Sequence, residues 1–183
     1  MDFKTTLETL IEVFEKEKIR YAVIGGFALG VLGVPRATVD LDFLIEKDDL
    51  EKINRIMKSH SYDCVYQSEN VSQYVSPVKI FGEVDFLHAF RAISRKMLGR
   101  AKEVDIFEGK AKIKVLLPED IIGLKVQSLA NNPKRLSKEY ADIEALMDYH
   151  KGSLDWKSIE EYFLLFDLKD KFLELKDEYC HAE

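Results

Sequence analysis

A glycine pair followed thirteen residues later by two acids in one apolar run is the feature that most constrains this chain. The apolar run Tyr21–Ile24 leads into Gly25 and Gly26, and a second apolar run carries Asp40 and Asp42. Side chains alternate along a strand, so we expect both acids to point to one face of a sheet. Two such carboxylates repel each other unless a cation lies between them. Mg²⁺ prefers one or two carboxylates together with substrate phosphates, so the pattern predicts a divalent metal site.

The residues around these acids indicate how the segment sits in a fold. Val39, Leu41 and Phe43 alternate with the acids, so we expect all three to point into a core on the opposite face. The glycine pair lies at the expected junction of a strand and a short helix. Bare backbone N–H groups at such a junction allow close approach of a phosphate. The alternative is a glycine that only a tight turn requires.

This arrangement resembles the nucleotidyltransferase superfamily, which has the DNA polymerase beta-like fold. The motif of that family is a Gly-Gly or Gly-Ser pair, a spacer of this length, and Asp-x-Asp flanked by apolar residues. A third family carboxylate lies on a neighbouring strand, and Asp85 within Gly82–Leu87 stands in a suitable alternating pattern. The resemblance covers roughly residues 20–90. The alternative is an edge strand whose exposed face carries two acids, although Asp is disfavoured in strands.

The resemblance implies a fold, a reaction and a set of metal ligands. A nucleoside monophosphate would pass from an NTP to an acceptor hydroxyl, and pyrophosphate would leave. Asp40, Asp42 and Asp85 would hold Mg²⁺, or Mn²⁺, in a two-metal site, and Asp85 would take the proton of the acceptor. Gly25 and Gly26 would bring backbone N–H groups to the phosphates.

Further residues match small stand-alone members of the abortive-infection and toxin–antitoxin type. The order Arg-x-Thr-x-Asp-Leu-Asp places Arg36 and Thr38 beside the acids, where the resemblance implies nucleotide binding. A later helix that opens with Pro-Glu-Asp carries Lys125, expected on the triphosphate, and Asp142, expected to orient it. Arg135 is a weaker candidate. The alternatives are a surface arginine and an ion pair on a helix surface.

The periodicity of the chain predicts an α/β (α+β) fold: a mixed β-sheet with flanking helices, followed by a helical C-terminal part. We expect a nucleotidyltransferase core over 1–116 and a helical region packed on it over 117–183. The expected strands are 21–24, 37–45, 62–67, 71–75, 78–81, 83–87, 104–107 and 111–116. The expected helices are 2–18, 27–32, 47–59, 93–98, 118–130, 137–149, 155–166 and 168–179.

Composition restricts the partners. The net charge of −6 argues against a general nucleic-acid binder, although residues 91–138 carry a net charge of +7 that would attract a triphosphate. No apolar run is long enough to span a bilayer, and the N-terminal segment is an amphipathic helix, so we expect a cytoplasmic protein without membrane contact. Cys64 and Cys180 lack metal spacing, and we expect no disulfide. The four histidines also lack metal spacing; among them, His88 follows the Asp85 strand.

The sequence leaves the acceptor open between tRNA, a protein and a small molecule such as an antibiotic. A homodimer or a toxin–antitoxin partner is also compatible with it. Two other classes compete with an active transferase. One is a non-catalytic NTP-binding, regulatory or antitoxin module that has kept the fold, and the other is a metal-dependent hydrolase or nuclease.

Overall fold

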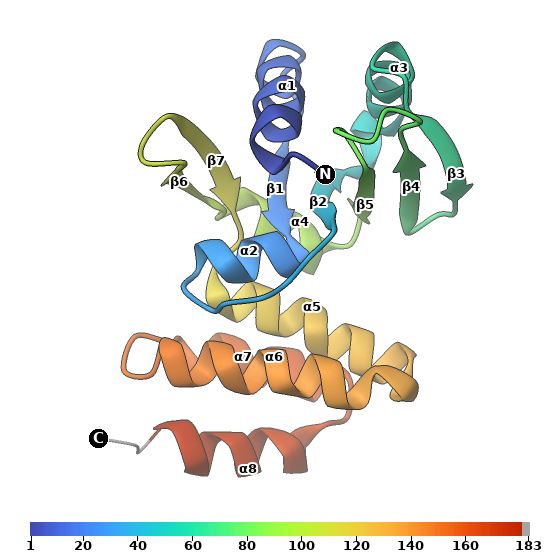
Figure 1. Ribbon diagram of the computed structural model, residues 1–183. Helices are drawn as coiled ribbons and strands as arrows, with labels where there is room; N and C mark the ends of the chain where they lie inside the picture. The colour runs from blue at the N-terminus through green and yellow to red at the C-terminus, as the bar shows by residue number, and fades with distance from the viewer. Residues whose placement is uncertain (181–183) are drawn as a thin grey trace. The chain divides into compact units, whose positions relative to one another are not determined.

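The chain divides into two compact units. The computed structural model describes residues 1–180, except for the side chain of Pro133 (Figure 1). The first unit contains Met1–Val31 and Arg36–Leu116, and the second contains Leu32–Pro35 and the chain from Leu117 onward. Within the described residues, no helix has the length and apolar character needed to cross a membrane.

The first unit is built on one mixed seven-stranded sheet, in the order β3-β4-β5-β2-β1-β7-β6. At its centre, β2 pairs parallel with β5 and antiparallel with β1, and β1 pairs parallel with β7. The outer pairs β3–β4, β4–β5 and β6–β7 are antiparallel. The strands are β1 (Tyr21–Ile24), β2 (Asp40–Glu46), β3 (Asp63–Gln67), β4 (Val71–Val75), β5 (Glu83–Ala89), β6 (Lys102–Ile106) and β7 (Ala111–Val115).

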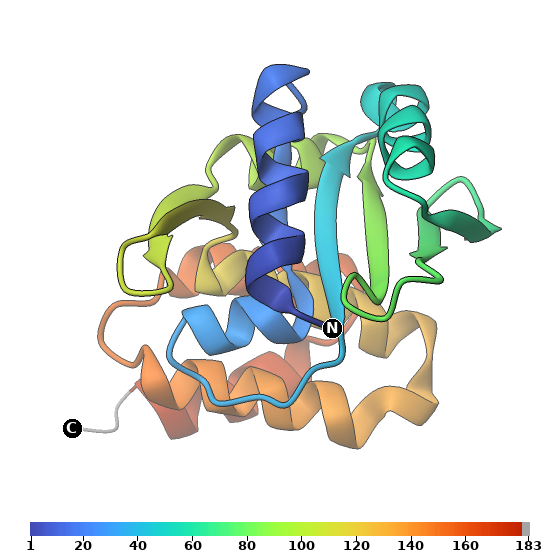
Figure 2. The ribbon, with the colours of Figure 1, turned by 45° about the horizontal axis from the view of Figure 1, so that its top comes forward.

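Helices cover this sheet through a core of aromatic rings. The helices of the first unit are α1 (Phe3–Lys16), α2 (Gly25–Val31), the short 3₁₀ turn η1 (Lys47–Asp49), α3 (Leu50–Ser59) and α4 (Ala92–Gly99). Figures 1 and 2 both show α1 alongside β1 and β2. From α1, Phe14 packs its ring against Tyr21, Phe43 and Phe86, with ring centroids 5.5 to 6.2 Å apart. This face is therefore the hydrophobic core of the unit.

The second unit is helical: α5 (Pro118–Asn131), η2 (Pro133–Arg135), α6 (Leu136–Tyr149), α7 (Trp156–Leu165) and α8 (Lys169–Cys180). Proline at the first turn of α5 suits a helix start, because its missing N–H has no partner there. The two acids of this turn, Asp120 and Glu119, are buried, and they accept hydrogen bonds from α7 and from the residue that caps it. Asp120 accepts a hydrogen bond from the Tyr162 hydroxyl, and Glu119 accepts one from the Asp155 backbone N–H at 2.9 Å.

The segment Leu32–Pro35 belongs to this second unit because the C-terminal end of α6 holds it. His150 Nε2 lies 2.9 Å from the Leu32 carbonyl oxygen. Gly33 has φ +90°, and a Cβ atom there would lie 2.1 Å from the ring of Tyr149. Only glycine therefore fits at this position without moving the tyrosine.

The predicted mixed sheet with flanking helices and a helical C-terminal part is confirmed. Two details of the sequence prediction are wrong. Residues 78–81 form a turn closed by a hydrogen bond from Phe81 N to Val78 O, and the Ile80 carbonyl in this turn accepts a bond from Asp2 N. Val39 does not point into the core but is 77% exposed, because β2 begins only at Asp40, where β5 first provides a partner.

Candidate active site

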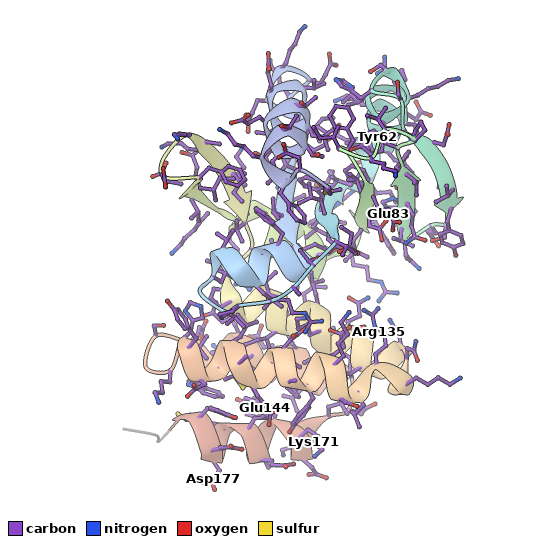
Figure 3. All side chains as sticks on the ribbon, in the orientation of Figure 1. Tyr62, Glu83, Arg135, Glu144, Lys171 and Asp177 are labelled. Carbon is purple, nitrogen blue, oxygen red and sulfur yellow. The ribbon has the colours of Figure 1, made fainter. Side chains whose placement is uncertain are left out.

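The first unit brings the three predicted acids onto two adjacent parallel strands. Asp42 on β2 is the register partner of Asp85 on β5, and Asp40 is the partner of Glu83. Register partners in neighbouring strands point to the same face, so the carboxylates of Asp40, Asp42 and Asp85 share one face of the sheet. Glu83, labelled in Figure 3, lies at the start of β5 on this face. All three predicted acids are half-buried.

Thr38 holds the first acid. Its Oγ1 donates a hydrogen bond of 2.6 Å to Asp40 Oδ1 and lies 3.3 Å from the Asp40 carbonyl. The structure thus places Thr38 beside the acidic strand. Arg36 is also half-buried in the extended segment before β2.

Each residue of the glycine pair faces a side chain of the acidic segment. Gly25 has φ +66°, and a Cβ atom there would lie 1.9 Å from Asp42 Oδ2. A Cβ atom on Gly26 would lie 2.7 Å from Thr38 Cβ. Both distances are shorter than real contacts allow, so the glycines admit the approach of Asp42 and Thr38. This close approach is a reason for glycine at both positions that is separate from the phosphate contact suggested by the sequence.

Asp85 lies in a less polar environment than an exposed acid. Burial raises the pKa of Asp85, and the negative charges of Asp40 and Glu83 raise it further, against a hydrogen bond that lowers it. That bond comes from Gln73 on β4, the register partner of Asp85, whose Nε2 lies 2.8 Å from Asp85 Oδ2. The sequence analysis missed Gln73, since only strand register brings it to Asp85.

Asp85→Asn is expected to increase the free energy of unfolding of the metal-free protein at pH 7. Because the folded state raises the pKa of Asp85, it binds the proton more tightly than the unfolded chain does. Stability therefore falls as pH rises from the ordinary Asp value of about 3.9 through the raised value. Asn accepts the Gln73 hydrogen bond without a charge, so it removes this penalty. Urea denaturation in EDTA should show the gain at pH 7 and little at about pH 3, and a loss at pH 7 would contradict the assignment.

In the second unit, Lys125 lies between two buried acids. Its Nζ is 2.9 Å from Glu139 Oε2 and 2.6 Å from Asp142 Oδ2, and the three side chains are only 5 to 11% exposed. Glu139 also binds Arg135 (Figure 3) at 2.9 Å and Ser128 at 3.2 Å. Burial works to raise the pKa of Glu139, but Lys125, Arg135 and Ser128 together lower it.

The predicted pairing of Lys125 with Asp142 is therefore present, but it is not an ion pair on the helix surface. The sequence analysis missed Glu139. Its spacing from Asp142 on one helix face was the available signal.

His88 does not join the acids. As the register partner of Ile45 it points to the opposite face, where it is 3% exposed. Its ring nitrogens lie 3.0 Å from Ser72 Oγ and 3.0 Å from the Glu69 carbonyl oxygen, and burial lowers its pKa. His88 is thus a partnered core residue. Of the other histidines, His181 lies outside the described residues.

Nearly the whole chain matches the model of a known protein family. Residues 2–173 match the model of a family described as uncharacterised nucleotidyltransferase. The chain belongs to this nucleotidyltransferase family. The sequence-based recognition of the nucleotidyltransferase superfamily and the prediction of a nucleotidyltransferase enzyme are therefore confirmed. Among curated proteins, none matches this nucleotidyltransferase.

Solved structures with the same fold include an antibiotic-resistance factor and an antibiotic adenylyltransferase. The antibiotic-resistance factor ANT(2'')-Ia is 15% identical to this nucleotidyltransferase, with all of both chains covered and a TM-score of 0.66. The lincosamide antibiotic adenylyltransferase LnuA is 16% identical over 79% of this chain and 96% of its own, with a TM-score of 0.57. A nucleotidyltransferase-like protein from Paracoccidioides brasiliensis is 20% identical over 96% and 91%, also with a TM-score of 0.57. At these identities the likeness establishes the fold.

The donor set of this nucleotidyltransferase fits a hard divalent cation. The three acids offer only oxygen ligands, and the absent Cβ of Gly25 makes room for the Asp42 carboxylate. In the described part of the chain, no three His, Cys, Asp or Glu side chains are arranged to hold a metal ion by themselves. Mg²⁺ does not require such a cluster, since it is usually bound by one or two carboxylates plus substrate phosphates and water.

Proposed function

We propose that this chain transfers a nucleoside monophosphate from an NTP to an acceptor hydroxyl with release of pyrophosphate, in a reaction that requires Mg²⁺. One observation carries the proposal: Asp42 faces Asp85 across two parallel strands, with Asp40 on the same face. Membership of a nucleotidyltransferase family supports the reaction class.

Asp40, Asp42 and Asp85 are the residues that would hold the metal. When bound, Mg²⁺ or Mn²⁺ supplies positive charge against the triphosphate and makes the acceptor hydroxyl more acidic. We assign to Asp85 the role of accepting the acceptor proton, and its raised pKa in the metal-free protein supports this assignment, because a higher pKa makes a carboxylate a better proton acceptor. Positioning and neutralisation of charge provide most of the acceleration in phosphoryl transfer.

The nucleotide would bind along the segment that joins the glycine pair to the acids. We assign Gly25 and Gly26 to phosphate contact through their backbone N–H groups, and Arg36 to charge neutralisation of the triphosphate. Thr38 donates a hydrogen bond to Asp40, and we assign it to the same nucleotide site. The roles of Lys125 and Asp142 in triphosphate binding stay predictions from the resemblance.

We propose that the acceptor is a small molecule that carries a hydroxyl group. The antibiotic-resistance factor ANT(2'')-Ia and the lincosamide antibiotic adenylyltransferase LnuA share this fold. A protein or a tRNA is the alternative, and incubation with labelled NTP and each class of acceptor distinguishes them. A cytoplasmic location stays a prediction, and so does a second copy or a toxin–antitoxin partner.

Asp40→Asn/Asp42→Asn is expected to abolish Mg²⁺-dependent NTP binding while the protein remains folded, because the variant removes two metal ligands and their mutual repulsion. Calorimetric titration of each of the four NTPs into wild type and variant, with Mg²⁺ and then with EDTA, measures this effect. Binding that the variant and EDTA both abolish supports the proposal and names the preferred base. Binding unaffected by either change would contradict the metal site and favour a regulatory NTP-binding module, and no binding by wild type would contradict the proposal.

A further inference from the structure

Gln73, which lies outside the predicted site, donates a side-chain hydrogen bond to one of the three acids. It lies on β4, directly opposite Asp85 in register, and its Nε2 is 2.8 Å from Asp85 Oδ2. Gln73, Asp85 and Asp42 therefore form one row across β4, β5 and β2.

The strand that carries Gln73 is fixed by its neighbours on the other face. Ser72 is fully buried and its Oγ lies 3.0 Å from His88 Nε2. Tyr74 is 2% exposed and its hydroxyl donates a hydrogen bond to Asn54 on α3. Because both flanking residues are anchored in the core, the backbone of Gln73 has little freedom. The amide is thus presented to Asp85 from a rigid support.

The amide of Gln73 is also a suitable hydrogen-bond donor to a carboxylate that binds a metal ion. An amide N–H₂ group occupies one carboxylate oxygen and leaves the negative charge of Asp85 in place. A lysine or arginine at this position would neutralise that charge and compete with a cation. Thr38 bonds Asp40 in the same way, with a neutral hydroxyl on one oxygen. Two of the three acids are thus oriented by uncharged donors.

We propose that Gln73 is a positioning residue of the metal site: its amide holds Oδ2 of Asp85 and so leaves Oδ1 for the divalent cation. This inference rests on the proposed function, because it gives Asp85 the role of a metal ligand. Partners that orient metal ligands typically contribute about 10- to 100-fold to metal affinity.

The test measures Mn²⁺ affinity of the full chain by electron paramagnetic resonance of the free ion, without nucleotide. Gln73→Met keeps the size of the side chain and removes the donor, so it should weaken Mn²⁺ binding by about 10-fold. Gln73→Lys should weaken it further, because an ammonium group then lies against Asp85. The matched control is Gln67→Met on the exposed strand β3, which should bind Mn²⁺ as wild type does.

Thermal denaturation of the metal-free variants distinguishes a loss of Asp85 positioning from a loss of the fold. For Gln73→Met, we expect weaker Mn²⁺ binding at a Tm close to that of the wild type. For Gln73→Lys, we expect a Tm that is not below that of Gln73→Met. Wild-type affinity in Gln73→Met would overturn the inference, as would an equal loss in Gln67→Met. If Asp85→Asn binds Mn²⁺ normally while Asp42→Asn does not, the inference fails, and Mg²⁺-dependent NTP binding by the wild type would still support the proposed transfer. Wild-type protein that binds no Mn²⁺ without nucleotide would overturn the inference, and wild-type protein that also binds no NTP with Mg²⁺ would overturn the proposed function.

Discussion

Gly25→Ala is expected to weaken Mg²⁺-dependent NTP binding by roughly 100-fold, the upper end of what displaced metal-ligand supports cost. The new methyl group would lie 1.9 Å from Asp42 Oδ2, so the carboxylate must move out of its place between β1 and β5. The backbone adds a second penalty, because φ +66° costs an L-residue about 1–2 kcal/mol.

Gly109→Ala is the matched control for this experiment. Gly109 also has a positive φ, +79°, but a Cβ atom there meets nothing within 4 Å. It should therefore show the backbone penalty without the displacement of a site residue. Calorimetric NTP titration and urea denaturation of both variants measure the two effects. Equal NTP affinity in Gly25→Ala and Gly109→Ala would contradict the role of Gly25 in placing Asp42.

Lys125→Met is expected to lower the free energy of unfolding by about 3 kcal/mol, the lower end of the range for breaking a buried ion pair. The substitution leaves Glu139 and Asp142, with side chains 5% and 6% exposed, without the cation that they share. Glu139 keeps its contact with Arg135, which limits the loss. Urea denaturation at pH 7 measures this change.

Two further variants separate the buried charges from the loss of a lysine. Lys171→Met removes an exposed ion pair with Glu174 and should change stability little. The triple variant Lys125→Met/Glu139→Gln/Asp142→Asn removes all three charges and should recover most of the loss. Stability of Lys125→Met equal to that of Lys171→Met would contradict a buried network. NTP titration of the triple variant then tests the predicted triphosphate contact of Lys125.

The sequence was sufficient for the features that depend on neighbouring residues. The acids at 40 and 42 share a face because side chains alternate along any strand, whatever surrounds it. Thr38 lies two residues before Asp40 and reaches it within one extended segment. The family motif is local in the same sense, which explains why the sequence supported the reaction class and the mixed fold.

Two predictions that relied only on the local apolar pattern were wrong. The apolar residues of 78–81 suggested a strand, and Val39 continued the alternation of β2. Whether an extended segment becomes a strand depends on a partner for its backbone groups, and neither Val39 nor the 78–81 turn has one in the sheet. Propensity alone does not supply that partner.

The sequence by itself determined the residue types of the site and their local spacing: a glycine pair, two acids on one strand and a third on another. Only the tertiary structure decided which residues support them. Gln73 reaches Asp85 across twelve residues of chain, and Glu139 reaches Lys125 across fourteen. The register of two strands and the packing of two helices set these contacts, and both depend on the burial of apolar surface by the whole unit rather than on any local sequence.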